Sequence, residues 1–281
     1  MKLKGLNHKF DGNESRNSVS WYHHKPSVNN LKRGSNRDIK GIKKADAKFL
    51  CSKRVMAKYS VGLEVEKNSF HADVLNHNHA FIQGLERDGS CGVEAVTNML
   101  PLLPNCAWKT KVFAGFYELE KLFDDRFSPS NNDCGGHMTI GSHEVEPRDL
   151  WHGLKRYAGI VYALYRFRLN GEHTHLNKRM DLRRNTKYSP FYKKSYGVEI
   201  RLISRFKSVQ DACERYNLIA ELVRGVEYGL TFEQVLGNCN KVFNRMYEND
   251  AEKIAEIKEL SHLFQKWIAF GQGHEKIARF I

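Results

Sequence analysis

Hydrophobic and polar residues alternate with a period of two in several short stretches of the chain. Side chains of successive strand residues point to opposite faces, so this alternation predicts β-strands. The segments are residues 59–68 (YSVGLEVEKN), 92–96 (GVEAV), 137–141 (HMTIG) and 196–204 (YGVEIRLIS). We expect Pro101 to end the second strand, because proline cannot donate a ladder hydrogen bond.

Other segments repeat their apolar residues at helical spacing. The first is residues 150–167, which begin after a start signal of Pro147 and Asp149. Three more helices are predicted at residues 209–225, 231–247 and 251–270. Gly225 is expected to cap the first of these three, and Thr231 with Gln234 forms a potential capping box.

The order of these elements predicts an α+β fold. We expect a sheet-centred catalytic domain over residues 56–281, with residues 209–281 as a helical C-terminal part packed behind the sheet. Residues 1–55 are rich in Asn, Ser and His and have little apolar periodicity. They are predicted to form a basic N-terminal arm that is extended or partly disordered.

The net charge of +13 is unevenly distributed. Residues 1–60 hold 15 Lys/Arg against 4 Asp/Glu, and residues 166–207 hold 12 against 3. The remainder of the chain is therefore acidic. The arm could bind nucleic acid, an acidic polymer or a larger assembly, or it could be a solvated arm or a strap across the domain.

Composition excludes several classes of protein. With 41% hydrophobic residues the chain can bury a core, and no apolar run approaches the roughly 20 residues that span a bilayer. The first residues carry charge without an apolar run, so we expect no signal peptide. The six cysteines include no CxxC pair. They are typical of reduced, mostly buried thiols in a cytoplasmic protein, and a structural zinc site is not expected.

Candidate ligands lie on each predicted strand. Carboxylates at alternating positions of neighbouring strands can converge on one floor, where their mutual repulsion requires cations. Mg²⁺ and Mn²⁺ suit such oxygen-rich sites, and the planar fork of Arg201 suits phosphate. The candidates for this floor are Glu64, Glu66, Glu94, His137 and Glu199.

Four motifs in this order resemble the ATP-dependent amidoligases. They are GLEVEKN (62–68), DGSCGVEAV (88–96), GGHMTIG (135–141) and GVEIRLIS (197–204). The amidoligases belong to the glutamine synthetase and glutamate–cysteine ligase superfamily of carboxylate–amine ligases, and the resemblance covers about residues 56–225. It implies an antiparallel-sheet funnel that holds ATP and Mg²⁺ (or Mn²⁺). It also implies that an amide or isopeptide bond forms through an acyl phosphate.

The resemblance assigns roles residue by residue. It implies metal ligation by Glu64, Glu66, Glu94, His137 and Glu199. It implies that Arg201 steadies the transferring phosphoryl group, that Asp88 supports the site or the substrate, and that Arg184 contributes to catalysis. Contacts to phosphate or to the substrate carboxylate are implied for Arg183, Arg184, Tyr188 and Arg201. Thr139 departs from the family pattern, since many members have a second His or Asn there.

The implied partners are a small-molecule or peptide carboxylate and an amine, in the cytoplasm of a bacterial cell or a phage-infected host. The resemblance is compatible with a monomer or an oligomer, and no membrane is expected. Two alternatives stay open. DGSCGVEAV is also close to the start of OTU-type cysteine proteases, with Cys91 as nucleophile and His274 as the late histidine. The other is a non-catalytic nucleotide- or nucleic-acid-binding or assembly protein on a degenerate ligase fold, using the arm and its segment 21–26 (WYHHKP).

Overall fold

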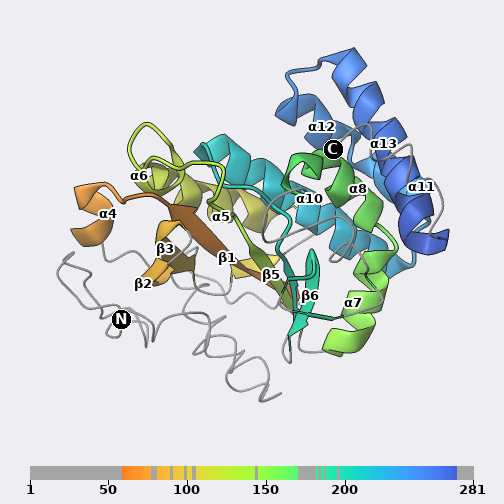
Figure 1. Cartoon of the computed structure of the whole chain (residues 1–281), viewed down its shortest axis with the longest axis horizontal. Coiled ribbons are helices and arrows are strands. Elements are labelled where there is room, and N and C mark those ends of the chain that lie inside the picture. Colours follow the sequence, from red (N-terminus) through yellow and green to blue (C-terminus); the bar gives the residue numbers. More distant parts are fainter. Residues whose placement is uncertain are drawn as a thin grey trace. The chain divides into compact units, whose positions relative to one another are not determined.

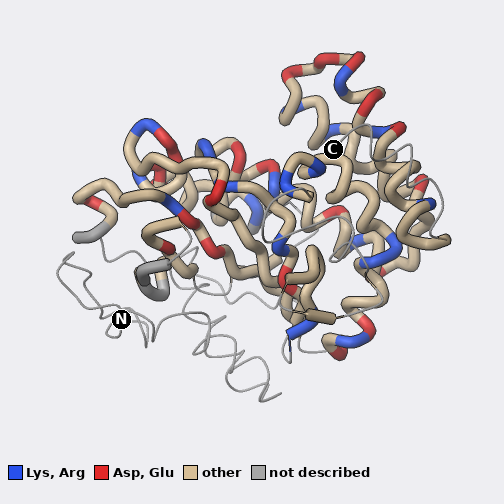
Figure 2. The backbone as a smooth tube through the Cα atoms, in the orientation of Figure 1, with Lys and Arg blue, Asp and Glu red and all other residues tan. Residues whose placement is uncertain are grey.

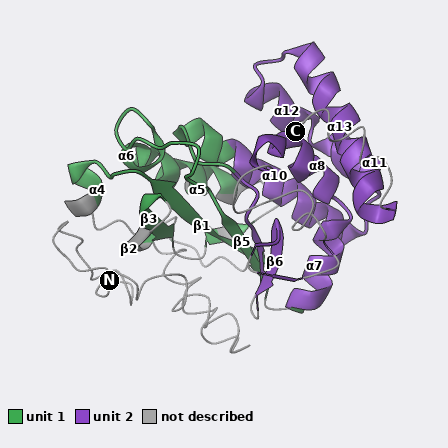
Figure 3. Ribbon diagram, in the orientation of Figure 1, with its two compact units in different colours: residues 1–146, 195–197, 204–213 green, residues 147–194, 198–203, 214–281 purple. Residues whose placement is uncertain are grey.

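The structure is a computed structural model. It describes residues 59–76, 81–88, 91–97, 100–102, 106–142, 145–169, 182, 185–186, 188–194 and 197–270. Its contacts divide the chain into two compact units (Figure 3). Unit 1 consists of residues 1–146, 195–197 and 204–213, and unit 2 of residues 147–194, 198–203 and 214–281. The predicted basic arm lies outside the described residues.

The strands form one sheet (Figure 1). They are β1 (Tyr59–Lys67), β2 (Ile82–Asp88), β3 (Gly92–Thr97), β4 (Leu100–Leu102), β5 (Met138–Ser142), β6 (Phe191–Lys194) and β7 (Gly197–Ile200). Their order is β2-β3-β1-β5-β7-β6, and β4 also pairs with β1. The pairs β1–β3, β1–β4, β1–β5 and β2–β3 are antiparallel. An α+β fold with an antiparallel sheet is therefore confirmed.

β2, β4 and β6 were not predicted as strands, and two further differences concern β7 and Pro101. β7 ends at Ile200, earlier than predicted, because the amide of Arg201 donates to the carbonyl of Pro190 at 2.8 Å. The expectation for Pro101 was wrong, since it lies inside β4 opposite Ser60 of β1. An edge strand, which pairs with another strand on one side only, tolerates a residue without an N–H group.

The core of unit 1 lies against one face of β1. All nine residues of this strand are buried, and Leu63 and Val65 belong to the apolar face. Around it are α4 (Ala72–Asn76), α5 (Cys106–Glu118) and α6 (Glu120–Phe123). Successive edge-to-face contacts, with ring centroids 6.1, 5.3 and 5.4 Å apart, join Phe81, Phe116, Phe123 and Phe206. Such pairs stabilise a core beyond their buried area.

Lys67 ends the apolar face of β1 with a buried cation. Its side chain is fully buried, and Nζ donates 2.8 Å hydrogen bonds to the carbonyls of Phe123 and Phe206 and to Oδ1 of Asp125. All three ammonium donors are thus satisfied, as a buried charge requires. Burial nevertheless lowers the pKa of Lys67, and the hydrogen bond to Asp125 opposes that shift.

Unit 2 holds most of the helical elements. They are α7 (Pro147–Lys155), α8 (Ala158–Leu164), the 3-10 turn η2 (Arg166–Arg168), α10 (Val209–Tyr228), α11 (Phe232–Asn238), α12 (Asn240–Met246) and α13 (Ala251–Phe270); the first residues of α10 belong to unit 1. The predicted helix at 251–270 is confirmed. So is the capping box, in which Thr231 and Gln234 bond reciprocally.

Two predicted helices are interrupted. The segment 150–167 breaks between α7 and α8, where Tyr157 leaves helical geometry and its hydroxyl lies 2.8 Å from the carbonyl of Gly225. The segment 231–247 breaks between α11 and α12 at Cys239. Periodicity continues across both breaks, so it could not reveal them.

Gly225 does not cap α10, which was predicted to end there. The helix continues to Tyr228, and Gly229 follows with a left-handed φ of 61°. A Cβ on Gly225 would lie 2.5 Å from Val235 and 2.9 Å from the ring of Tyr157. Glycine is therefore needed there for close packing, and the C-terminal turn is made at Gly229.

α8 packs along α13 at a similar close approach. A Cβ on Gly159 would lie 2.5 Å from the carbonyl of Ser261, and the Gly159 amide donates to Gln265 at 2.9 Å. The rings of Tyr162 and Phe264 meet at 5.8 Å. The two helices are thus joined by both packing and hydrogen bonding.

Charge along the described chain is mixed in sign. Residues 61–281 hold 30 Lys/Arg against 28 Asp/Glu, and Figure 2 shows positions of both signs along both units. Most of the positive excess therefore belongs to the N-terminal arm. Among the described helices, none combines the length and apolarity that crossing a membrane would require.

Candidate metal centre

Two carboxylates lie on the face of β1 that is opposite the core. Glu64 and Glu66 are two residues apart, so they share this face, and their exposed fractions are only 1% and 5%. Glu94 of β3 lies directly opposite Glu66 in the register and is also buried. The register thus places Glu66 and Glu94 side by side on neighbouring strands, two residues from Glu64 along β1.

His137 adds an imidazole to this face. It immediately precedes β5, and its carbonyl accepts a 2.9 Å hydrogen bond from the amide of Glu64. Its Nδ1 lies 2.8 Å from Oε2 of Glu64 and 3.4 Å from Oε1 of Glu66. With His137 only 6% exposed, these are short, desolvated contacts, in which charge interactions are stronger than in water.

Gly135 leaves the space that this arrangement needs. Its amide donates to Oε2 of Glu66. A Cβ at Gly135 would lie 2.6 Å from Nε2 of His137 and 3.1 Å from Oε1 of Glu66. Any larger residue would therefore displace one of the two side chains. Glycine here serves the site and not a turn.

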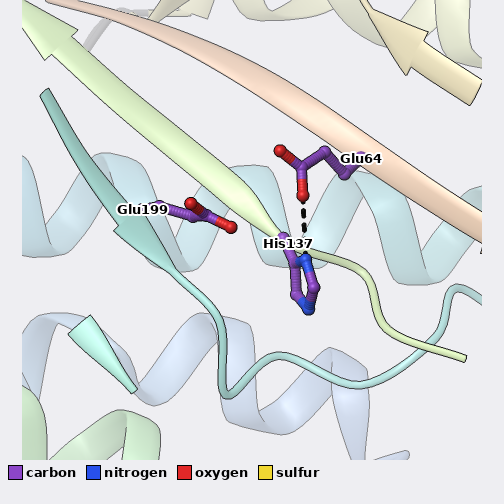
Figure 4. A group of neighbouring side chains, drawn as sticks. All are labelled: Glu64, His137 and Glu199. Carbon is purple, nitrogen blue, oxygen red and sulfur yellow. Dashed lines mark hydrogen bonds and ion pairs between the residues drawn. The ribbon is translucent and has the colours of Figure 1, made fainter. Parts of the chain in front are cut away.

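Glu199 is the third potential ligand and comes from β7. It is fully buried, and its carboxylate forms 2.5 Å ion pairs with Nζ of Lys194 and Nη1 of Arg201. One ligand atom from each of Glu64, His137 and Glu199 lies within 4.8 Å of the other two. Figure 4 shows these side chains, with His137 hydrogen-bonded to Glu64.

The donor set fits a divalent cation. Ligands at about 2.1 Å from one ion lie about 3 Å apart when they are neighbours and about 4.2 Å apart when they are opposite, so atoms within 4.8 Å of one another would have to approach by about 1–2 Å. Carboxylates suit Mg²⁺ and Mn²⁺, whereas an imidazole nitrogen favours transition metals. Among the predicted cofactors, Mn²⁺ is therefore the better match to this donor set.

Thr139 lies on the same face of the sheet as Glu64. It pairs with Gly62 across the β1–β5 ladder and is two residues from His137. Its side chain is 1% exposed, and within the described part of the chain its hydroxyl has no hydrogen-bond partner. A buried polar atom without a partner is costly, and a ligand on this face would satisfy it.

The remaining predicted site residues are described only in part. Tyr188 lies in the turn before β6 and is 37% exposed. Asp88 ends β2 opposite Gly92, and its side chain is outside the described set. Arg183 and Arg184 are outside the described residues altogether. Of the predicted ligands, Glu64, His137 and Glu199 lie together. Glu66 also contacts His137, and Arg201 pairs with Glu199.

Sequence reasoning missed two residues near the candidate site. Lys194 pairs with Glu199, and only its place in the basic segment 166–207 pointed to such a role. Glu86 lies opposite Glu94 in the β2–β3 register, so Glu66, Glu94 and Glu86 occupy one row across three strands. The signal for Glu86 was the residue alternation of β2, which was not recognised as a strand.

Cys91, the nucleophile of the protease alternative, is buried at 5% exposure, and its thiol donates to the carbonyl of Val93. His274, the histidine of that alternative, lies outside the described residues. A catalytic thiol requires access and a base. The burial of Cys91 therefore favours a structural thiol.

Comparisons with known proteins do not assign a family. A comparison with models of known protein families finds no match to the chain. A comparison with curated proteins finds no match either. The function must therefore be inferred from the chemistry of the side chains.

Proposed function

We propose that this protein is an ATP- and divalent-metal-dependent carboxylate–amine ligase. The observation that carries the proposal is the buried group of Glu64, His137 and Glu199, whose ligand atoms lie within 4.8 Å of one another. Buried carboxylates with no role are rare, because burying a charge is costly. A site that binds a cation explains why they are retained.

The cationic side chains beside Glu199 support the choice of a phosphate-containing substrate. Lys194 and Arg201 both pair with this carboxylate. A bound cation would compete for Glu199 and release their N–H donors for phosphate oxygens, to which Arg can bond in a bidentate way. The group thus offers both the ligands for a metal and the donors for a nucleotide.

The chemistry that this arrangement supports is activation of a carboxylate by phosphoryl transfer. A divalent ion at Glu64, His137 and Glu199 would neutralise phosphate charge. Arg201 and Lys194 would orient the γ-phosphate toward the substrate carboxylate, and an amine would then displace phosphate to leave an amide. Positioning and charge neutralisation supply most of the acceleration in phosphoryl transfer. The buried face of β1 would exclude the water that competes with the amine.

Calorimetry with Mn²⁺ tests the metal centre without any knowledge of the substrates. We expect the native chain to bind Mn²⁺, and Glu64→Gln and Glu199→Gln to bind it at least roughly tenfold more weakly. Glu259→Gln, an exposed position on α13, is the matched control and should bind like the native chain. Absence of Mn²⁺ binding by the native chain would refute the proposal.

ATP binding then tests the ligase. We expect ATP to bind only with the metal present and to be weakened in Arg201→Ala, but not in Arg224→Ala, whose side chain is 46% exposed. Metal binding without metal-dependent ATP binding would retain the metal centre and reject the ligase.

A further inference from the structure

Two buried threonines in neighbouring strands differ in how their hydroxyl groups are used. Thr97 of β3 is fully buried, and its Oγ1 accepts a 2.8 Å hydrogen bond from the amide of Leu63. Thr139 of β5 is only 1% exposed, but its Oγ1 has no hydrogen-bond partner within the described part of the chain. The sheet therefore satisfies one buried threonine and leaves the hydroxyl of the other without a partner.

The strand register places the hydroxyl of Thr139 on the face that carries the candidate ligands. Thr139 lies opposite Gly62 of β1. Residues two apart on a strand point to the same face, so Thr139 shares its face with Glu64 and with His137. At about 3.3 Å per residue, the backbones of Thr139 and His137 are roughly 6.6 Å apart. Because β5 lies between β1 and β7 in the sheet, both neighbouring strands supply a ligand, Glu64 and Glu199 (Figure 4).

The packing of β5 does not explain why this residue carries a hydroxyl. Valine matches threonine in shape and forms strands equally well. A buried hydroxyl that has lost its water and gained no partner lowers stability, and valine would avoid that cost. The hydroxyl of Thr139 is therefore better explained by a ligand than by the fold.

We propose that Thr139 hydrogen-bonds a water molecule of the cation held by Glu64, His137 and Glu199, and so positions this water. The inference rests on the metal centre of the proposed function. Mg²⁺ and Mn²⁺ take about six ligands and retain several waters, and the group of side chains offers three ligand atoms. A cation polarises its water and makes it a stronger donor. The oxygen of Thr139 can accept that hydrogen bond without adding another negative charge beside the carboxylates.

Mn²⁺ calorimetry with three variants tests the proposal. Thr139→Val removes the hydroxyl and should bind Mn²⁺ roughly tenfold more weakly than the native chain, as expected for a lost outer contact of a metal site. Thr139→Ser retains the hydroxyl and should bind with close to native affinity. Thr97→Val is the matched control. Thr97 is three residues from Glu94 on β3, so it lies on the opposite face of the sheet, and this variant should bind Mn²⁺ like the native chain.

Urea unfolding without metal separates this role from a structural one. A hydroxyl without a partner adds no stability, so Thr139→Val should unfold at the same urea concentration as the native chain or at a higher one. Thr97→Val should unfold at a lower concentration, because it leaves the amide of Leu63 without its acceptor. Weaker metal binding with no loss of stability is a combination that a purely structural hydroxyl would not give.

Three results would overturn the inference and leave the metal centre in place. The first is native affinity for Mn²⁺ in Thr139→Val. The second is weaker binding by Thr139→Val together with unfolding at a lower urea concentration, which would make the hydroxyl structural. The third is a Thr139→Ser chain that binds as weakly as Thr139→Val. Failure of the native chain to bind Mn²⁺ would instead refute the metal centre itself, and with it the proposed function.

Discussion

Replacing Lys67 with methionine should lower the free energy of unfolding by about 3 kcal/mol. The ammonium is fully buried and donates to the carbonyls of Phe123 and Phe206 at 2.8 Å. Leaving a buried acceptor unsatisfied costs roughly 1–3 kcal/mol. Asp125 is partly exposed and also accepts from Ser130, so it adds little. Removal of the ammonium's desolvation penalty offsets part of the loss.

Urea unfolding measures this effect, with Lys121→Met as the matched control. Lys121 also pairs with a carboxylate, that of Asp73, but its side chain is 45% exposed. Exposed pairs contribute roughly 0–1 kcal/mol, so this variant should change stability little. If Lys67→Met unfolds at the same urea concentration as Lys121→Met with the same slope, the reasoning is refuted. The desolvation penalty of Lys67 would then have equalled the gain from its hydrogen bonds.

The same pair of proteins gives a test against pH. Burial lowers the pKa of Lys67 below the ordinary 10.5. Between the lowered pKa and 10.5 the unfolded state binds more protons than the folded state, so stability rises with pH in that window. Relative to Lys67→Met, the native chain should therefore gain stability as the pH rises toward 10.5. A stability difference that stays constant or falls over this range would contradict the lowered pKa.

Four further substitutions test separate features, three of them by urea unfolding and Gly135→Ala by Mn²⁺ titration. The hydrogen bond from Arg126 lowers the pKa of Asp124, so Asp124→Asn should lower the free energy of unfolding by up to about 1 kcal/mol at pH 7. This loss should shrink as the pH falls through the lowered pKa. A stability difference that stays the same in acid would contradict the lowered pKa. Gly237→Ala, in α11 with no atom within 4 Å of the new Cβ, should stabilise the chain by roughly 0.5–1 kcal/mol. Gly135→Ala should weaken Mn²⁺ binding, because the new Cβ clashes with His137. A stable Gly135→Ala chain with native affinity would argue against the candidate site. Tyr157→Phe should destabilise by about 1 kcal/mol, since it removes a buried hydroxyl bonded to backbone carbonyls, and no loss would show that these carbonyls find other donors.

Local patterns were sufficient for the elements whose cause is local. Alternation predicted β1 and placed Glu64 and Glu66 on one face, because the geometry of an extended chain alone decides that. The capping box at Thr231 was predictable for the same reason, since its two hydrogen bonds lie within four residues. The amphipathic pattern of residues 251–270 predicted α13, which buries Ile254, Ile257, Leu260 and Phe264 and leaves Phe270 exposed.

Tertiary contacts decided what those patterns could not. The break at Tyr157 and the continuation of α10 through Gly225 both arise from one packed contact between segments about 70 residues apart.

The candidate site also depends on tertiary contacts. The amino-acid sequence determined that carboxylates would lie on one face of β1, but only strand pairing brought Glu94 opposite Glu66 and His137 to Glu64. Register depends on which apolar faces pack together over long sequence separations. A local pattern therefore identifies the candidate ligands, and the folded sheet decides which of them meet.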